Sequence, residues 1–162
     1  MIKLVSVDDR LLHGQIAFFW TQYLKLNKII ILNTEAANDE FTRMVLELAK
    51  PKNVDLVISE LEKGYDLVER ELNQNESSVL VILGNLFDAN KLIEHFIYQI
   101  NHLNIVGLRV RPNSKQIDDR TSLTIEDISI IKKLINNNVT VTVRTSPKDK
   151  EIRLTIDKIM NF

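Results

Sequence analysis

Several features common in proteins are missing from this sequence, and each absence excludes a class of structure or function. Its 162 residues include no cysteine, which excludes disulfide bonds, thiolate catalysis and cysteine-ligated metal sites. No apolar run approaches the roughly 18 residues that a membrane-spanning helix needs. With only four glycines and three prolines, the chain also has no linker or low-complexity tract. These absences leave a globular chain with a single core.

Charge of one sign is not in excess either. The chain carries 21 basic and 22 acidic residues, for a net charge of −1, so nothing overall indicates nucleic acid or anionic lipid as a partner. Any recognition of anions must therefore be local. The start, Met-Ile-Lys, leads into a strand-like run without the features of a secretory signal peptide. We expect a cytoplasmic protein with one domain over residues 1–162.

Short aliphatic runs alternate along the chain with longer segments of helical spacing. This alternation is typical of a parallel sheet covered on both faces. Strands are expected at residues 2–7, 28–32, 54–59, 79–83, 105–110 and 139–143, and helices at 15–25, 39–50, 60–72, 88–99, 125–136 and 149–160. Residues 111–124 suit a loop or a short extra strand. The predicted fold class is three-layer α/β, with an open, mostly parallel sheet of six or seven strands and helices on both faces.

The stretch VDDRLLHGQ, Val7 to Gln15, directly follows the first predicted strand. In an open parallel sheet, ligands bind beyond the carboxyl ends of the strands, where this loop is expected. Arg10 offers a planar cation suited to phosphate oxygens. His13 lies at the start of the first helix, where free backbone N–H groups favour an anion, and Gly14 leaves room for close approach. The stretch therefore predicts an anion site.

His13 is also a candidate nucleophile, because an imidazole near neutral pH is partly uncharged and has a lone pair available. Phosphoryl transfer depends mainly on positioning and charge neutralisation, which this loop can supply without a metal. Asp8 or Asp9 either orients the second imidazole nitrogen or holds Arg10, and the sequence does not choose between these roles. The same triplet, DDR, recurs at residues 118–120 with no histidine or glycine after it, so the triplet alone is a weak indication.

Four other features have ordinary explanations beside functional ones. His95 and His102 have no third metal ligand at useful spacing, which favours plain surface or partly buried histidines. Phe18–Trp20 suits core packing, although three consecutive residues cannot all face inward and one is free to meet a partner. Asn38-Asp39 suits a helix cap. Lys148 follows the last predicted strand, on the same edge as the first loop, and either contacts phosphate or an acidic partner or is simply solvated.

The run IKLVSVDDRLLHGQIAFFW resembles the opening of the IIB component of the mannose-type (mannose, fructose, sorbose) bacterial sugar phosphotransferase system. The hallmark of that family is a strand followed by DDRLxHGQ and a nearby tryptophan, here Asp8 to Gln15 and Trp20. The likeness continues in NTEAANDEFTRMVLELAKP and in TIEDISIIKKLINNNVTVTVRTSPKD. It therefore covers nearly the whole chain.

The resemblance implies a phosphocarrier enzyme, a protein-N(pi)-phosphohistidine–sugar phosphotransferase. A phosphorylated IIA domain would pass its phosphoryl group to Nδ1 of His13, and His13 would pass it to a sugar during uptake through the membrane subunits IIC and IID. The protein would then associate peripherally with the inner face of the membrane. No cofactor, metal or nucleic acid is expected, and a homo-oligomer remains possible.

The resemblance also suggests roles for individual residues of this sequence. His13 is the expected nucleophile, with Arg10 stabilising the phosphate and Asp9 orienting the imidazole. The expected set around phosphate or substrate is Asp8, Leu12, Gly14 and Gln15, and Trp20 and Lys148 are candidates for partner contact.

Two departures from the family pattern and two alternatives remain. Ser6 stands where members often have arginine, and Gly107-Leu108 stands where members tend to have paired glycines. Both departures bear on the pocket and on the rate of transfer, and they admit a regulatory phosphoacceptor that no longer phosphorylates sugar. A receiver domain would also place acidic residues after its first strand, but it needs an aspartate after the third strand, and Asp66 falls within the third predicted helix.

Overall fold

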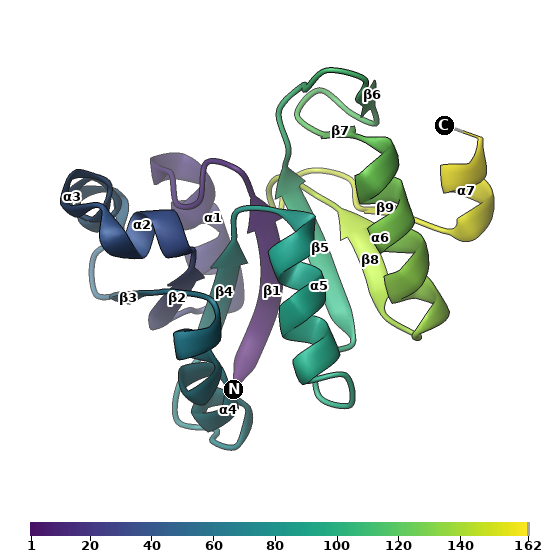
Figure 1. The fold of residues 1–162 in the computed structure, drawn as a ribbon. Helices are drawn as coiled ribbons and strands as arrows, with labels where there is room; N and C mark the ends of the chain where they lie inside the picture. Colours follow the sequence, from purple (N-terminus) through teal and green to yellow (C-terminus); the bar gives the residue numbers. More distant parts are fainter. Residues whose placement is uncertain (162) are drawn as a thin grey trace.

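The structure, a computed structural model, describes residues 1–161 and has a seven-stranded sheet with helices on both faces (Figure 1). The strand order is β3-β2-β4-β1-β5-β8-β9, and all neighbours are parallel except β8 and β9. The sheet strands are β1 (Ile2–Asp8), β2 (Lys28–Leu32), β3 (Asp55–Ser59), β4 (Val79–Leu83), β5 (His102–Gly107), β8 (Thr140–Val143) and β9 (Ile152–Arg153). The predicted fold class is confirmed.

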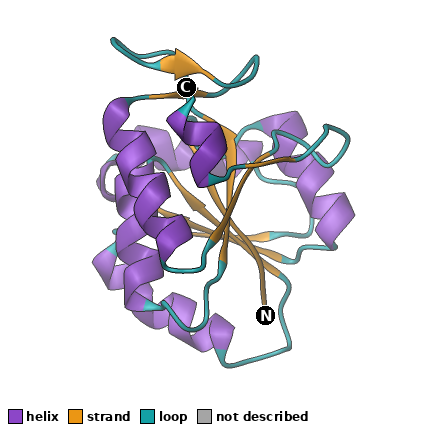
Figure 2. Cartoon of the chain, turned by 90° about the vertical axis from the view of Figure 1, so that its right-hand side faces the viewer, coloured by secondary structure: helices purple, strands orange, loops and turns teal. Residues whose placement is uncertain are grey.

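Seven α-helices and one short hairpin complete the described part of the chain. The helices are α1 (Gly14–Leu24), α2 (Thr34–Asn38), α3 (Glu40–Ala49), α4 (Tyr65–Leu72), α5 (Leu86–His95), α6 (Ile125–Asn136) and α7 (Ile156–Met160), and the 3₁₀ turn η1 (Glu62–Gly64) precedes α4. The strands β6 (Lys115–Gln116) and β7 (Ser122–Leu123) form a separate antiparallel hairpin. Figure 1 shows this hairpin beyond the carboxyl end of β5, and in the turned view of Figure 2 it lies at the top of the molecule.

Two buried clusters fill the space between the sheet and its helices. One cluster joins α1, α2 and α3 to one face, through residues such as Trp20 and Leu46. The other joins α4, α5, α6 and α7 to the opposite face, through residues such as Leu92 and Ile131. The central strands are buried on both faces, which explains why β2 and β4 are nearly continuous aliphatic runs, KIIIL and VLVIL. No helix within residues 1–161 is both long and apolar enough to cross a membrane.

The topology creates a crevice at the carboxyl end of β1. β1 and β4 are neighbours in the sheet, but the helices that follow them, α1 and α5, pack on opposite faces. The loops after the two strands therefore diverge, and ligand sites of open α/β sheets form at such a point. The segment that follows β1 is the stretch from Asp9 to His13.

The expected elements differ from the observed ones in several places, one of which is α5, which spans Leu86–His95 where residues 88–99 were expected. β5 begins three residues earlier than expected, because residues 102–105 pair with β8, and it ends at Gly107, where the chain turns toward the β6–β7 hairpin. The helix expected over residues 149–160 is wrong in its first half, which forms β9 against the edge strand β8. The short helix α2 was not expected at all.

Capping side chains determine where several helices begin. The sequence predicted such a cap for the helix that is α3 in the structure. The Asp39 carboxylate accepts a hydrogen bond from the backbone N–H of Thr42 at 2.8 Å, which confirms the expected cap at Asn38-Asp39. A reciprocal capping box of Thr124 and Asp127 begins α6, whose bounds match the expected range of residues 125–136.

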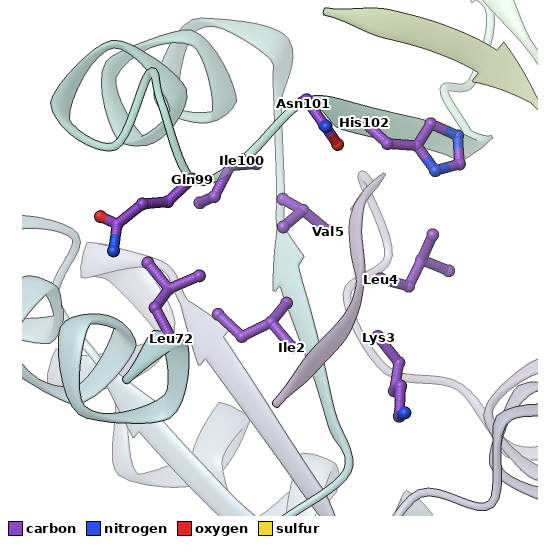
Figure 3. A pocket seen from close by; sticks show the side chains of 9 residues that line it. All are labelled: Ile2, Lys3, Leu4, Val5, Leu72, Gln99, Ile100, Asn101 and His102. Carbon is purple, nitrogen blue, oxygen red and sulfur yellow. The ribbon is translucent and has the colours of Figure 1, made fainter. Parts of the chain in front are cut away.

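A hollow of about 110 Å³ lies at the opposite, amino edge of the sheet (Figure 3). Side chains from the start of β1, the end of α4 and the turn before β5 surround it, among them Ile2, Leu72 and Ile100. It is small, it is partly apolar and it lies away from the crevice. The candidate site is therefore at the carboxyl edge.

Candidate active site at the carboxyl end of β1

The carboxylate of Asp8 is the centre of the candidate site. Asp8 is the last residue of β1 and is only 2% exposed. Its Oδ1 accepts hydrogen bonds from the backbone N–H of Arg10 at 3.0 Å and from Nε of Arg10 at 3.1 Å, and its Oδ2 lies 3.4 Å from Nη2 of Arg10. Oδ2 also lies 3.8 Å from Nε2 of His13. One buried carboxylate therefore holds the guanidinium in place and lies beside the imidazole.

Asp9, expected to orient His13, lies against Arg109 in the structure. The Oδ2 atom of Asp9 accepts hydrogen bonds from the backbone N–H of Arg109 at 2.9 Å and from its Nε at 3.1 Å. Successive residues at the end of a strand point to opposite sides, so only one of the two aspartates can face the imidazole. Asp8 takes that place, and Asp9 fastens the first loop to the segment after β5.

The imidazole of His13 presents only one of its two nitrogens. Nε2 is buried beside Asp8 and has no hydrogen-bond partner within 3.5 Å, whereas 34% of the side chain is exposed. Burial of the ring lowers the pKa of His13 below its ordinary value of about 6.5. The positive charges of Arg10 and Arg120 lower the pKa further, and the charge of Asp8 partly opposes them. The ring is therefore neutral near pH 7, with a lone pair available.

The backbone around His13 is arranged to receive an anion. His13 is the N-cap residue of α1, with an extended conformation (φ −141°, ψ 134°), and its side chain makes no cap hydrogen bond. The first intrahelical bond of α1 runs from the N–H of Ala17 to the carbonyl of His13 at 3.2 Å. The N–H groups of residues 14–16 therefore have no partner within the helix, and they point toward the site with the positive end of the helix dipole.

The loop between β1 and α1 contains a strained turn at Leu11. Leu11 has φ 58°, in the left-handed region, and its N–H donates to the carbonyl of Asp8 at 2.9 Å. The side chain of Leu12 is buried in the cluster beneath α1, where it anchors the loop. Leu12, expected near phosphate or substrate, therefore contributes its side chain to the core. The left-handed conformation of Leu11 costs of the order of 1 kcal/mol, and the packing of the neighbouring buried side chains compensates for that cost.

Gly14 and Gln15, the other two residues expected around phosphate, lie at the exposed start of α1. A Cβ atom added to Gly14 would meet no atom within 4 Å. Packing within the protein therefore does not require glycine at this position, and the open space beside the helix start is available to a ligand.

The two candidates for partner contact have different environments. Trp20 is 5% exposed, and its indole N–H donates to the carbonyl of Thr145 at 3.0 Å. Its ring is in the core and ties α1 to the loop after β8, so partner contact by Trp20 stays a prediction that this burial does not favour. Phe18 is the exposed member of the aromatic run, at 51%. Lys148 is exposed, and its Nζ lies 4.4 Å from the centre of the Phe19 ring.

Both departures from the family pattern have a structural explanation. Ser6 is buried within β1, where its hydroxyl donates to the carbonyl of Val81 at 3.3 Å, so it adds no charge to the pocket. A Cβ at Gly107 would lie 3.1 Å from Nη2 of Arg10, so a larger residue there would require the guanidinium to shift by a few tenths of an ångström. Leu108 belongs to the core and bridges to Thr121. The single glycine is thus where the guanidinium passes close to the backbone.

Two arginines at the site were missed at the level of sequence. Arg109 reaches the first loop through Asp9, and Arg120 comes from the second DDR triplet, to which the sequence analysis gave no role. Arg120 lies close enough to His13 for its charge to lower the histidine pKa. The only available signal was the clustering of arginines after the fifth strand, and the pairing that brings them to His13 is long-range. Two clefts, of about 490 and 270 Å³, flank Arg10 on either side.

The site has no grouping typical of a metal centre. Within residues 1–161, no three histidine, aspartate or glutamate side chains come together in a way that would hold a metal ion. The other histidines lie apart from the site. His95 stacks on Tyr65, and Nε2 of His102 lies 2.9 Å from the hydroxyl of Thr142. The groups that converge on the crevice are one imidazole, guanidinium groups, the carboxylates of Asp8 and Asp9, and backbone donors.

Comparison with known proteins shows which family this chain belongs to. A family model described as "PTS system sorbose subfamily IIB component" matches residues 2–161. The sorbose-specific EIIB component of Klebsiella pneumoniae is 32% identical over 158 residues, which are 98% of this chain and 94% of that protein. The crystal structure of the IIBSor domain of the sorbose permease from the same organism superposes with a TM-score of 0.86 at 30% identity, covering 99% of this chain and 96% of that one.

A second relative is longer than this chain. The mannose-specific EIIAB component of Escherichia coli K12 is 27% identical over 154 residues, which are 95% of this chain but 47% of that protein. The chain therefore spans about half the length of that relative.

Proposed function

The chain belongs to the sorbose subfamily of IIB components, phosphotransfer domains of the mannose-type sugar phosphotransferase system, and on that premise we propose that His13 is its phosphoryl carrier. In this proposal, His13 accepts the phosphoryl group of a phosphohistidine on a IIA domain and transfers it to a sugar. The sugar is taken up at the same time through membrane subunits of the IIC and IID type.

The observation that carries the proposal is the position of the two imidazole nitrogens. Nε2 of His13 is buried beside the carboxylate of Asp8 and is out of reach of a donor. The accessible nitrogen is therefore Nδ1, and it carries the lone pair when Nε2 holds the proton. The lowered pKa keeps most of the imidazole neutral at pH 7, which is the form that can attack phosphorus.

The transfer step balances without a metal or any other reactant. The lone pair of Nδ1 forms the new N–P bond while the N–P bond of the donor breaks, and the donor ring leaves as a neutral imidazole with the electron pair. The proton on Nε2 stays in place, so the phosphorylated ring of His13 becomes positively charged. The carboxylate of Asp8, 3.8 Å away, stabilises that charge.

The phosphoryl group itself would lie among donors that are already in place. Arg10 is fixed against Asp8 by three contacts, and its guanidinium suits the equatorial oxygens of a transferring phosphoryl group. The N–H groups at the start of α1 supply further donors without a side-chain rearrangement. In the second transfer, from His13 to a sugar hydroxyl, the same donors would stabilise the same charge.

The partners and location follow from the proposed reaction. The EIIAB name of the Escherichia coli relative places IIA and IIB in one chain, which fits direct transfer between the two domains. We propose that this chain works at the inner face of the membrane, bound to its permease subunits. The fructose-specific, mannose-specific and sorbose-specific names of its relatives leave several sugars as candidates.

Phosphorylation in a reconstituted system tests the proposal. The wild-type protein is incubated with phosphoenolpyruvate, the general phosphotransferase proteins and a cognate IIA, and it is followed by intact mass and ³¹P NMR. We expect one acid-labile, alkali-stable phosphate, which is absent from His13→Ala. His95→Ala is the matched control, because His95 is exposed on α5 outside the crevice and should leave phosphorylation unchanged. Phosphate retained by His13→Ala would disprove the assignment.

A further inference from the structure

Three arginines line one side of the candidate site, and only one of them has a free guanidinium. Arg10, Arg109 and Arg120 border the cleft of about 270 Å³ beside the first loop. The guanidinium of Arg10 is bound to Asp8 and that of Arg109 to Asp9. The side chain of Arg120 makes no hydrogen bond or ion pair with any residue in the described range 1–161. Its donors are available to a ligand.

The fold holds the backbone of Arg120 firmly in this position. Its carbonyl accepts a hydrogen bond from the N–H of Leu108 at 3.1 Å, and the N–H of Ser122 donates to the carbonyl of Leu108 at 2.8 Å. These bonds fasten the β6–β7 hairpin to the end of β5. The carbonyl of Arg120 is also 3.5 Å from the position that a Cβ of Gly107 would occupy. The β6–β7 hairpin therefore places Arg120 at the same cleft that Arg10 borders.

The two DDR triplets share one local hydrogen bond. The backbone N–H of Arg10 donates to Oδ1 of Asp8 at 3.0 Å, and the backbone N–H of Arg120 donates to Oδ1 of Asp118 at 2.9 Å. In the first triplet the carboxylate also binds the guanidinium of its own arginine. In the second it does not, because Asp118 binds only the backbone. The second turn presents its arginine outward with the side chain unpaired.

The charge of Arg120 reaches His13. Among the charges that act on the histidine, Arg120 lowers its pKa together with Arg10. A cation that disfavours a positive charge on the ring favours a negative charge attached to it. The same position thus suits a phosphoryl group bound to Nδ1.

We propose that Arg120 is a second phosphate-binding residue, whose guanidinium contacts the phosphoryl group carried by His13 from the side of the β6–β7 hairpin. This assignment rests on the proposed function of His13. Arg10 and Arg120 then hold the phosphoryl group from two directions, one guanidinium being fixed by Asp8 and the other being free to move with the group. An arginine with a mobile side chain can follow phosphorus as it passes between donor, His13 and acceptor, while a fixed one defines the starting geometry.

The test compares Arg120→Gln with the wild type and with Lys115→Gln. Lys115 is an exposed cation of the same hairpin that does not border the cleft. Its replacement therefore removes the same charge from the hairpin but not from the cleft. Each protein is phosphorylated as above, and ³¹P NMR follows the second ionisation of the phosphoryl group with pH. The rate of phosphoryl acceptance from IIA is measured in parallel. Arg120→Lys tests whether charge alone is sufficient.

We expect the second ionisation of the phosphoryl group to move to higher pH in Arg120→Gln, because a cation no longer stabilises the dianion. The rate of acceptance should fall about tenfold, less than for a fully buried donor because Arg120 is exposed. Lys115→Gln should match the wild type, and Arg120→Lys should recover part of the loss.

Equal ionisation and rate in Arg120→Gln and the wild type would overturn the assignment of Arg120 and leave His13 as the carrier. Equal changes in Arg120→Gln and Lys115→Gln would also overturn it, because the effect would then come from general charge. A wild-type protein that takes up no phosphate on His13 would overturn the proposed function and this inference together, and the wild-type spectrum alone identifies that outcome.

Discussion

The carboxylate of Asp8 lies 3.8 Å from Nε2 of His13, and on its other side it binds the guanidinium of Arg10 at 3.1 Å. A single buried carboxylate therefore holds the cation that would stabilise the product and places its negative charge beside the imidazole of the proposed nucleophile. Carboxylates also lie beside the metal-binding histidines of other proteins, where they influence the basicity of the ring. The neighbouring aspartates therefore have different roles: Asp8 contacts Arg10 beside His13, and Asp9 contacts Arg109.

The first prediction separates those two aspartates. Asp8→Asn should slow phosphoryl acceptance by about 10-fold to 100-fold, as is typical when a group that orients a histidine is lost. It should also lower the pKa of His13 further, because the charge of Asp8 raises it. Asp9→Asn should have a smaller effect, since Asp9 binds Arg109. Stopped-flow transfer assays with phosphorylated IIA, with NMR titration of His13, measure both; a larger loss in Asp9→Asn would contradict the geometry.

The second prediction concerns pH. The folded-state pKa of His13 is below its ordinary value, so the folded protein binds fewer protons than the unfolded chain just below pH 6.5. The free energy of unfolding should therefore decrease as the pH falls through 6.5 toward the folded-state pKa. His102, whose pKa is lowered chiefly by burial, contributes with the same sign. Urea unfolding at pH 7.5 and 5.5 measures the change, and it should be smaller in the variant His13→Gln/His102→Gln.

The third prediction compares two glycines. Gly14→Ala should fold normally, with a free energy of unfolding unchanged or up to about 1 kcal/mol higher, because its Cβ meets no atom within 4 Å and alanine favours helices. Transfer to His13 should nevertheless slow, since the methyl group occupies space beside the phosphoryl group. Gly64→Ala is the control for packing. Its Cβ would lie 2.2 Å from the Cδ2 atom of Leu32, so we expect a loss of about 1–3 kcal/mol. Normal transfer by Gly14→Ala would show that this space is not used.

The fourth prediction concerns the aromatic run on α1. Trp20→Phe removes the hydrogen bond to the carbonyl of Thr145 and leaves a buried acceptor, which should cost about 1–3 kcal/mol in the free energy of unfolding. Phe18→Ala, at an exposed position, should change it by no more than about 0.5 kcal/mol. Circular dichroism during urea unfolding measures both changes. Tryptophan fluorescence is not suitable, because Trp20 is the only tryptophan and Trp20→Phe removes it. A stable Trp20→Phe with weakened IIA binding would restore its expected partner role.

The sequence was sufficient for much of the sheet because its signals are local. The aliphatic runs at residues 28–32 and 79–83 coincide with β2 and β4, and the spacing and capping at Thr124 place α6 correctly. Residues 149–155 were harder. Their composition is compatible with a helix, and they form the turn and short strand β9 because the edge of β8 offers unpaired backbone groups at that place.

The sequence by itself determined the site loop, its histidine and its first arginine, because all three lie within one strand-to-helix turn whose chemistry can be read from adjacent residues. Only the tertiary structure decided that Asp8 rather than Asp9 faces His13, that Trp20 is buried, and that Arg120 joins the site. Each of these depends on contacts between residues that are far apart in the chain, or on which side of a strand end a side chain lies. Such relationships are set by the packing of the whole sheet, and no local pattern encodes them.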